Sequence, residues 1–334
     1  MQAQLIALDW GTTSLRAYKL GKAGAVLDQR GLSYGIMALP HTPRVIHGQL
    51  CDDGFELAFD EACGDWLDAQ PGVPVIACGM VGSAQGWQEV PYSPTPIQVS
   101  GLSSQLQRLR SRRGVEVHLV PGVIQHSRLP NVMRGEETQV LGVLEGLPPE
   151  RRDAPLLVGL PGTHCKWVQV VEGRIERFDT FMTGEVYGLL CAHSILGRTQ
   201  QRSEGFNLQA FDCGVQVALS SEGDIGVLSN LFSARTLGLT GQLSGAEQGD
   251  YLSGLMIGHE LRAVAQVQRR EHAASLPEVV LIGSDALCQR YQRALTDVGF
   301  SVVSQAPHAT ERGLWSLACA AGLVTSVPED RLHA

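Results

Sequence analysis

The sequence predicts an α/β protein of two similar lobes, each with a mixed β-sheet and covering helices. Three observations support this prediction. Short apolar runs that end in glycine-containing turns alternate with longer segments whose apolar residues recur at helical spacing. One strand–turn–strand pattern occurs twice, half a chain apart. The chain has 334 residues, 44% of them hydrophobic, which is enough material for two cores.

The first copy of the repeat opens the chain. Residues 5–8 form an apolar run that ends in Asp9 and a Gly-Thr-Thr turn, and residues 15–20 form a second run. A third run begins at Val26, after the turn at 21–24. These runs predict three strands joined by tight turns.

The second copy begins near the middle of the chain. Residues 156–158 run into Pro161-Gly162-Thr163-His164, and residues 166–171 and 174–178 follow around a turn at Glu172-Gly173. Gly11-Thr12 of the first copy therefore corresponds to Gly162-Thr163. Turns of this kind also occur by chance in α/β proteins, so the repeat needs support from the chemistry of its residues.

The repeat predicts two lobes, 1–145 and 146–334, with both Gly-Thr turns facing a cleft between them. The polar stretch 146–155 is the expected boundary. In the second half, residues 252–267 and 310–324 predict helices, and residues 279–282 predict a buried strand that ends in Gly283-Ser284.

Composition excludes several classes of protein. The formal net charge is -8 and no basic stripe occurs, so we expect no nucleic-acid partner. No apolar run approaches the roughly 20 residues that span a bilayer, and the first residues do not resemble a signal peptide, so we expect a cytoplasmic protein without a membrane partner. The eight cysteines are scattered, without Cys-x-x-Cys spacing. A homo-oligomer is compatible with these properties.

The two commonest nucleotide-binding motifs are missing. The P-loop pattern is absent, and no two glycines lie two positions apart, so the dinucleotide fingerprint cannot occur. The turn after the first strand offers another phosphate cradle, with a carboxylate for magnesium, a glycine for close approach, hydroxyl groups, and a cation for phosphoryl charge. These residues are Asp9, Gly11, Thr12, Thr13, Ser14 and Arg16. Alternatively, Asp9 only caps a hairpin turn.

Five blocks, in order along nearly the whole chain, resemble a known family. They are Ala7-Leu8-Asp9-Trp10-Gly11-Thr12-Thr13-Ser14-Leu15-Arg16, Gly79-Met80-Val81-Gly82-Ser83 with Gly86-Trp87, Met133-Arg134-Gly135-Glu136-Glu137-Thr138-Gln139, Leu160-Pro161-Gly162-Thr163-His164-Cys165-Lys166-Trp167, and Phe181-Met182-Thr183-Gly184-Glu185. The chain resembles the sugar kinase/actin/heat-shock ATPase superfamily and, within it, the 2-dehydro-3-deoxygalactonokinase family. The first block marks only the superfamily, whereas the third and fourth are specific to the narrower family.

The resemblance implies a two-lobed actin/hexokinase-like (ribonuclease H-like) fold with an ATP cleft between the lobes. It also implies phosphorylation of the 6-hydroxyl of 2-dehydro-3-deoxy-D-galactonate by ATP with Mg²⁺, a step of galactonate breakdown. The second phosphate turn has Leu160 where the first has Asp9. The magnesium role is therefore expected of Asp9 alone.

A kinase that acts on an alcohol needs a base beside the acceptor, because the hydroxyl becomes a good nucleophile only as its proton leaves. Glu136 and Glu137 begin a predicted helix, 136–144, just before the second turn, where related sugar kinases place a catalytic acid. Adjacent helical residues point about 100° apart, so only one of the two can serve, and we expect Glu136. Both could instead be glutamates that the helix dipole favours in a first turn.

Further nucleotide contacts are expected in the second half. His164 and Lys166 follow the second Gly-Thr pair and could reach the β- or γ-phosphate, although Lys166 could equally be a solvated strand residue. Gly283-Ser284 resembles the superfamily's turn on the adenosine side. The alternative is an ordinary tight turn from strand to helix.

The sugar acid is expected to bind in the first half. The loop after residues 75–77 carries the candidate ligands Ser83, Gln85, Trp87, Glu89 and Tyr92. Arg134 could pair with the substrate carboxylate, since a guanidinium group suits that geometry. Trp87 and Tyr92 could instead be packing residues.

Three other functions stay open at the level of sequence. A kinase for 2-dehydro-3-deoxygluconate or a neutral hexose would use the same phosphate turns, because pocket details decide the substrate. A phosphate-ester hydrolase would place water where the sugar hydroxyl binds. A nucleotide-gated binding protein is the third alternative. We do not expect a sugar-responsive repressor, because the first strand leaves no room for a DNA-binding module ahead of it.

Overall fold

The protein is described by a computed structural model, which covers residues 2–271 and 276–325. The chain divides into two compact units, each with its own β-sheet and helices. Unit 1 comprises Met1–Ala154, Val171–Arg177 and Pro307–Ala334, and unit 2 comprises Pro155–Val170 and Phe178–Ala306.

The sheet of unit 1 has the strand order β3-β2-β1-β6-β10-β9. Its strands are β1 (Leu5–Trp10), β2 (Leu15–Leu20), β3 (Val26–Leu32), β6 (Val75–Gly79), β9 (Gln107–Arg110) and β10 (Glu116–Leu119). Strand β1 pairs antiparallel with β2 and parallel with β6, and β6 pairs parallel with β10. The sheet is therefore mixed, and the three strands predicted for the first repeat are confirmed.

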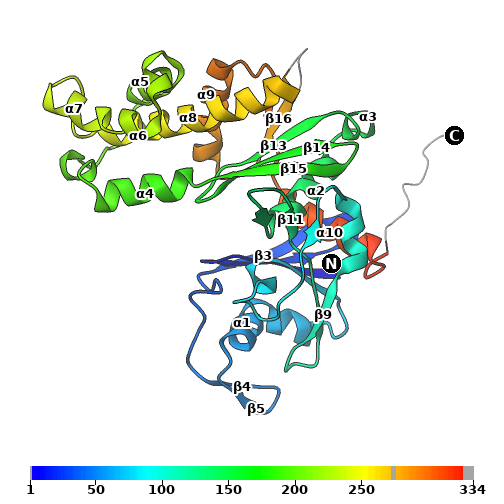
Figure 1. The fold of residues 1–334 in the computed structure, drawn as a ribbon. Coiled ribbons are helices and arrows are strands. Elements are labelled where there is room, and N and C mark those ends of the chain that lie inside the picture. Colours follow the sequence, from blue (N-terminus) through cyan, green and yellow to red (C-terminus); the bar gives the residue numbers. More distant parts are fainter. Residues whose placement is uncertain (1, 272–275, 326–334) are drawn as a thin grey trace. The chain divides into compact units, whose positions relative to one another are not determined.

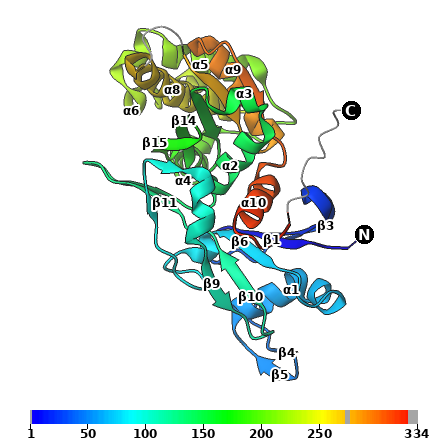
Figure 2. The ribbon, with the colours of Figure 1, turned by 90° about the vertical axis from the view of Figure 1, so that its right-hand side faces the viewer.

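Helices cover both faces of this sheet. Helix α1 (Gly54–Ala69) lies on one face, and α2 (Glu136–Gly146) and α10 (Ala309–Ala320) lie on the other (Figures 1 and 2). Asp53 caps α1 by accepting from Phe55 N at 2.9 Å and from Glu56 N at 3.2 Å. The shorter elements of unit 1 are α3 (Pro149–Arg152), β4 (Arg44–Ile46), β5 (Gln49–Cys51), β7 (Ser93–Pro94), β8 (Ile97–Gln98), β11 (Val123–Gln125), β12 (Asn131–Met133), and the 3₁₀ turns Lys22–Gly24, Met80–Gly82 and Val99–Gln105.

Unit 2 repeats the same topology. Its sheet contains β13 (Leu156–Leu160), β14 (Cys165–Val171), β16 (Glu278–Leu281), β17 (Val303–Gln305) and the end of β15 (Arg174–Phe181), which stand in the order β17-β16-β13-β14-β15. The sixth strand of this sheet is β8, which pairs with the first residues of β15. Numbered along each repeat, the strands of unit 2 have the order 3-2-1-4-5 and those of unit 1 the order 3-2-1-4-6-5, so β10 takes the place of β17 and β9 is an additional edge strand. In both units the second strand is antiparallel to the first and the fourth is parallel to it. The internal repeat is confirmed.

The helices of unit 2 are α4 (Thr183–His193), α5 (Leu208–Leu219), α6 (Val227–Asn230), α7 (Ser233–Leu239), α8 (Gln248–Glu271) and α9 (Asp285–Val298), with 3₁₀ turns at Gly197–Thr199 and Glu222–Ile225. Helices α5 and α8 cross closely because glycines stand at the contact (Figure 1). A Cβ on Gly214 would lie 2.1 Å from Tyr251 O, and one on Gly254 would lie 2.0 Å from Phe211 O. The predicted helix at 252–267 and the strand at 279–282 are confirmed.

Helix α10 belongs to unit 1, which differs from the division at 145/146 expected from the sequence. Its backbone lies against that of α2 through two glycines. A Cβ on Gly142 would lie 1.8 Å from Ala309 O, and one on Gly313 would lie 2.0 Å from Thr138 O. The helix ends before Gly322, whose positive φ of 71° favours glycine, so the predicted span of 310–324 was too long at its end.

Candidate active site

Asp9 lies near the end of β1, opposite Arg16 of β2. Arg16 Nη1 is 3.4 Å from Asp9 Oδ2, and the Asp9 side chain is only 18% exposed. Burial raises the pKa of the Asp9 carboxyl, Arg16 opposes this shift, and Glu311 adds to it. Asp9 is thus a largely buried carboxyl group beside a cation, and the charge of Glu311 also acts on it.

The turn after Asp9 exposes its threonines and anchors its main chain. Gly11 N donates to Ser14 O at 2.9 Å, and Met37 N donates to Thr12 O at 3.2 Å. The side chains of Thr12 and Thr13 are exposed, while Gly11 and Ser14 are half-buried. Hydroxyl groups on an anchored turn are well placed to contact an anion, as the cradle hypothesis requires.

Glu136 and Glu137 begin α2, as the sequence predicts. Two glycines bring this helix start to the end of β6, since a Cβ on Gly135 would lie 3.3 Å from Gly79 Cα. Glu137 is fully buried, and Gly135 N donates to its two oxygens at 2.9 and 2.8 Å. Glu136 is half-buried, and its Oε2 accepts from Arg134 N at 2.9 Å.

The three carboxyl groups lie in one region of unit 1. Burial, followed by the charge of Glu136, raises the pKa of Glu137 to about 8. Burial also raises the pKa of the Cys78 thiol on β6, and Asp9, Glu137 and Glu136 each raise it further. The structure therefore gathers the predicted catalytic carboxyls around the carboxyl ends of β1 and β6.

Arg134 is a buried cation, only 8% exposed. Its Nη2 donates to Val90 O at 2.7 Å, and its guanidinium carbon lies 4.3 Å from the centre of the Tyr92 ring. Within the described residues, Nε and Nη1 of Arg134 have no hydrogen-bond partner, and neither does the buried Oγ of Ser83. Gly82 directly precedes Ser83, and a Cβ on Gly82 would lie only 3.1 Å from Arg134 Nη1. Buried donors without acceptors are costly and suit an anionic ligand.

The remaining candidates on this loop differ in character. Trp87 packs with three aromatic residues, at 5.8 Å from Trp10, 6.2 Å from Phe55 and 5.5 Å from Phe59 between ring centres. These contacts favour the packing interpretation of Trp87. Gln85, Glu89 and Tyr92 are exposed.

The second phosphate turn lies in unit 2, between β13 and β14. Leu160 pairs with Lys166 as Asp9 pairs with Arg16, so the two repeats place a cation at the same position. Lys166 is buried, and its Nζ donates to Thr180 Oγ1 at 2.8 Å, so it is not a solvated strand residue. The exposed His164 ring contacts the carboxylate of Glu185.

The start of α4 packs on this turn. Glu185 N donates to Thr163 O at 3.0 Å. A Cβ on Gly184 would lie 2.2 Å from Gly162 O, so glycine is needed there for the close approach. The turn is thereby anchored from its carbonyl side, as is the turn of unit 1.

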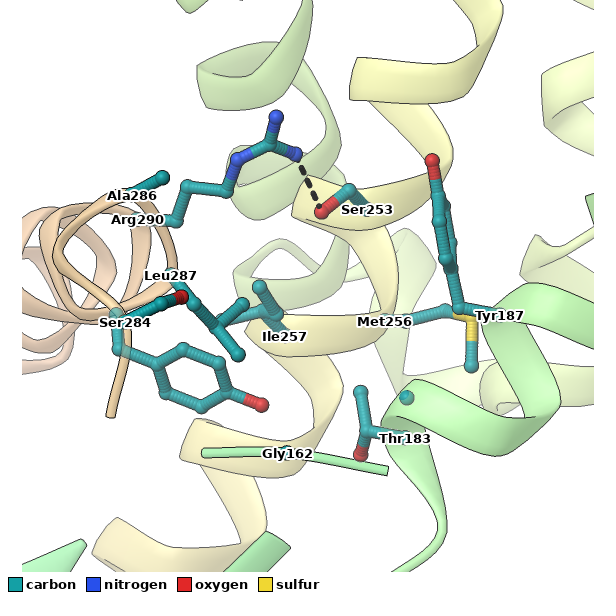
Figure 3. Close-up of a pocket in the computed structure, with 12 residues that line it drawn as sticks. Gly162, Thr183, Tyr187, Ser253, Met256, Ile257, Ser284, Ala286, Leu287 and Arg290 are labelled. Atoms are coloured by element: carbon teal, nitrogen blue, oxygen red, sulfur yellow. Dashed lines mark hydrogen bonds between the residues drawn. The ribbon is translucent and has the colours of Figure 1, made fainter. Parts of the chain in front are cut away.

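A pocket of about 250 Å³ in unit 2 joins the second turn to Gly283-Ser284 (Figure 3). Its walls come from the second turn, α4, α8 and α9, through Gly162, Thr183, Gly184, Tyr187, Ser253, Met256, Ile257, Ser284, Ala286, Leu287, Arg290 and Tyr291. At its rim, Arg290 Nη1 donates to Ser253 Oγ at 3.1 Å, and Nη2 lies 3.1 Å from Asp250 Oδ1. Apolar walls with a few polar groups are typical of a site for a flat organic ligand.

The comparisons with known proteins agree with this geometry. The model of the 2-keto-3-deoxy-galactonokinase family matches residues 9–317, nearly the whole chain. The chain belongs to this family. A 2-dehydro-3-deoxygalactonokinase from Escherichia coli (strain K12) is 33% identical over 321 residues, covering 95% of this chain and 98% of the relative.

Other members of the 2-keto-3-deoxy-galactonokinase family support the assignment. A Rhizobium meliloti (strain 1021) protein, named a probable 2-dehydro-3-deoxygalactonokinase, is 32% identical over 93% of this chain and 97% of its own length. A crystal structure from Sinorhizobium meliloti, provisionally given the same name, superposes with a TM-score of 0.78 at 30% identity, covering 95% of this chain and 98% of its own. The kinase family and the two-lobed α/β fold predicted from the sequence are both confirmed.

Sequence reasoning missed several residues of these sites. Glu311 in the first turn of α10 contacts His308 Nδ1 at 2.7 Å and acts electrostatically on Asp9, 302 positions away in the chain. Tyr187, Met256 and Arg290 of the unit 2 pocket lie on helices whose apolar spacing predicts only burial. No motif marks these positions, because the fold alone brings them to the sites.

Two features are absent from the residues that the structure describes. No group of three or more His, Cys, Asp or Glu side chains there is arranged to hold a metal ion. No helix in the described part is long and apolar enough to cross a membrane.

Proposed function

We propose that this member of the 2-keto-3-deoxy-galactonokinase family transfers the γ-phosphoryl group of ATP to the 6-hydroxyl of 2-dehydro-3-deoxy-D-galactonate. The products are 2-dehydro-3-deoxy-6-phosphogalactonate and ADP. The observation that carries the proposal is the gathering of Asp9, Glu136 and Glu137 at the strand ends of unit 1. Phosphoryl transfer to an alcohol needs such carboxylates, one for the metal and one for the proton.

In this proposal Glu136 is the general base. It accepts the proton of the attacking hydroxyl as the oxygen approaches the γ-phosphorus. Glu137 is less suited to this role, because both of its oxygens accept from Gly135 N and its raised pKa of about 8 favours the protonated form at neutral pH. The charge on Glu136 is one cause of that raised pKa.

Asp9 is the proposed contact for magnesium. Its carboxylate supplies the hard oxygen that Mg²⁺ prefers, and a site with few protein ligands suits an ion that keeps its waters and binds substrate phosphates. When bound, the ion neutralises charge on the β- and γ-phosphates. Arg16, beside Asp9, adds a positive charge for the transferred group, and Thr12 and Thr13 offer hydroxyl groups to its oxygens.

Unit 2 would bind the nucleotide. The pocket beside Ser284 has apolar walls for adenine, and Gly162 at its edge continues into the second Gly-Thr turn. His164 and Lys166 on that turn are the proposed phosphate contacts. Thr163 is anchored through its carbonyl by Glu185 N, which leaves its other groups for the ligand.

The sugar acid would bind through its carboxylate to Arg134 and Ser83. Their unpartnered donors are the feature that favours an acid over a neutral hexose, since a neutral sugar would leave the buried guanidinium without a counter-charge. Gln85, Glu89 and Tyr92 offer polar groups for the hydroxyl chain on the same loop.

A coupled assay of ADP release over a panel of substrates tests the function. The panel contains 2-dehydro-3-deoxygalactonate, 2-dehydro-3-deoxygluconate, glucose and no acceptor, each with and without magnesium. We expect turnover with the galactonate-derived acid only in the presence of magnesium. ADP release without any acceptor would indicate a hydrolase, and no release across the panel would overturn the kinase proposal.

A further inference from the structure

Unit 2 contains a buried carboxylate that the proposed chemistry does not use. Glu260 lies on α8 and is 3% exposed. Trp167 Nε1 donates to its Oε1 at 2.7 Å, and the Tyr291 hydroxyl donates to its Oε2 at 2.9 Å. The side chain of Thr183 also hydrogen-bonds to it. Three donors, from β14, α4 and α9, therefore meet at one carboxylate on α8.

The chemistry of these groups requires an acceptor at this position. An indole N–H can only donate, and hydroxyl groups can do so, whereas a carboxylate oxygen accepts. No ion pair in the described part of the chain includes Glu260, so hydrogen bonds alone compensate its burial. Burial raises the pKa of this carboxyl, and the donors offset only part of that shift. Because a buried carboxyl group is costly compared with an apolar side chain, its presence points to a role besides packing.

Each donor to Glu260 is tied to the pocket of unit 2 or to the second phosphate turn. The Cys165 thiol lies 3.1 Å from the Tyr291 hydroxyl and 3.4 Å from Gly162 O, to which it donates. Tyr291, Thr183 and Gly162 all line the pocket (Figure 3). Trp167 follows the turn on β14. The carboxylate thus connects the turn, the start of α4 and the wall formed by α9.

We infer that Glu260 is a positioning residue that holds the second phosphate turn and the Tyr291 wall in the arrangement that binds nucleotide. It does so without touching the nucleotide. The inference rests on the proposed function only in naming ATP as the nucleotide. The affinity for ATP should therefore depend on Glu260. The affinity for the sugar acid should not, because the proposed contacts of the acid lie in unit 1.

Glu260→Gln tests this inference in the full-length protein. Glutamine keeps the shape of the side chain but replaces one acceptor oxygen with an amide that donates, so at least one of the three donors loses its acceptor. We expect the Kd for ATP, measured by titration calorimetry, to rise about tenfold, as the loss of one or two hydrogen bonds to a charged group implies. We expect the KM for the sugar acid to stay within about twofold of the wild-type value, a split that a general loss of stability does not produce.

Glu56→Gln is the matched control. Glu56 is a carboxyl group in unit 1 that is 5% exposed and whose Oε1 accepts from Arg112 N at 2.8 Å, so the change has the same chemistry away from the pocket. We expect its Kd for ATP to equal that of the wild type. Trp167→Phe is a second variant, which removes one donor and keeps an aromatic ring, and we expect its Kd for ATP to rise about threefold.

Two results would overturn the inference. One is an unchanged Kd for ATP in folded Glu260→Gln, or in Trp167→Phe if the first variant does not fold. The other is an equal loss of ATP affinity in Glu260→Gln and Glu56→Gln, which would indicate destabilisation alone. Because calorimetry needs no acceptor, ATP binding by a wild-type protein that phosphorylates no acid would overturn the proposed reaction and leave this inference standing.

Discussion

Replacing Arg134 with methionine separates substrate recognition from stability. The substitution removes a buried guanidinium group whose Nε and Nη1 have no partner among the described residues. If these donors bind the substrate carboxylate, the variant loses a buried, charge-assisted contact worth about 2–5 kcal/mol. At 1.36 kcal/mol per factor of ten, kcat/KM for the acid should fall by about 30-fold to 5,000-fold.

The same substitution should cost the free protein little stability. Each unpartnered buried donor that is removed had cost about 1–3 kcal/mol. Against this, Val90 O loses its 2.7 Å hydrogen bond from Nη2, at about 1–3 kcal/mol, and the stacking on Tyr92 loses about 0.5–1 kcal/mol. The free energy gained by removing the unpartnered donors nearly equals the free energy lost with the hydrogen bond and the stacking. The melting temperature should therefore change by only a few degrees.

Steady-state kinetics over a range of sugar-acid concentrations and a thermal melt check both parts. Arg134→Lys is the control, because it keeps the charge and loses the planar fork, and its kcat/KM should lie between those of the wild type and Arg134→Met. A variant Arg134→Met that melts like the wild type and phosphorylates the acid with unchanged KM would refute the reasoning.

Four further outcomes are expected. Asp9→Asn should raise the magnesium concentration for half-maximal activity about tenfold, and an unchanged magnesium response would remove Asp9 from this role. Glu136→Gln should lower kcat about 10²–10⁴-fold and keep ATP binding; if it stays active while Glu137→Gln is inactive, Glu137 is the base. The pKa of Glu137, raised from 4.5 to about 8, means that the folded state holds the proton more tightly. Wild-type stability should therefore fall between these pH values by up to about 1.4 kcal/mol per unit, a slope that denaturant titrations should find missing in Glu137→Gln. Gly142→Ala should lower the melting temperature by about 5 °C, since its Cβ would meet Ala309 O, and an unchanged melt would contradict the close packing of α2 on α10.

Much of the fold could be predicted because the determining patterns are local. The apolar runs and turns of each repeat specify their strands without reference to the rest of the chain, and both meanders form where the sequence places them. The placement of α10 could not be predicted in this way. It depends on Gly142 and Gly313, which allow two helices that are far apart in the sequence to cross closely.

The candidate site shows the same division. Asp9, Gly11 and Thr12 could be proposed from the sequence because a carboxylate and a glycine turn at a strand end can hold phosphate, and because a second Gly-Thr turn occurs at the matching place of the repeat. By contrast, the residue type and position of Trp87 suggest a ligand contact, but its side chain packs against other aromatic rings. The exposure and the contacts of a side chain decide between these roles, and neither can be read from the sequence pattern.

The sequence by itself determined the repeated meander, the two Gly-Thr turns and the family, because each depends on residues that are neighbours in the chain. Only the tertiary structure decided that Glu311 lies near Asp9, that Arg134 is buried with unused donors, and that Glu260 joins four segments of unit 2. The physical reason is that burial and hydrogen bonding depend on distance in space. Residues hundreds of positions apart acquire a shared chemistry only when the sheets and helices have packed.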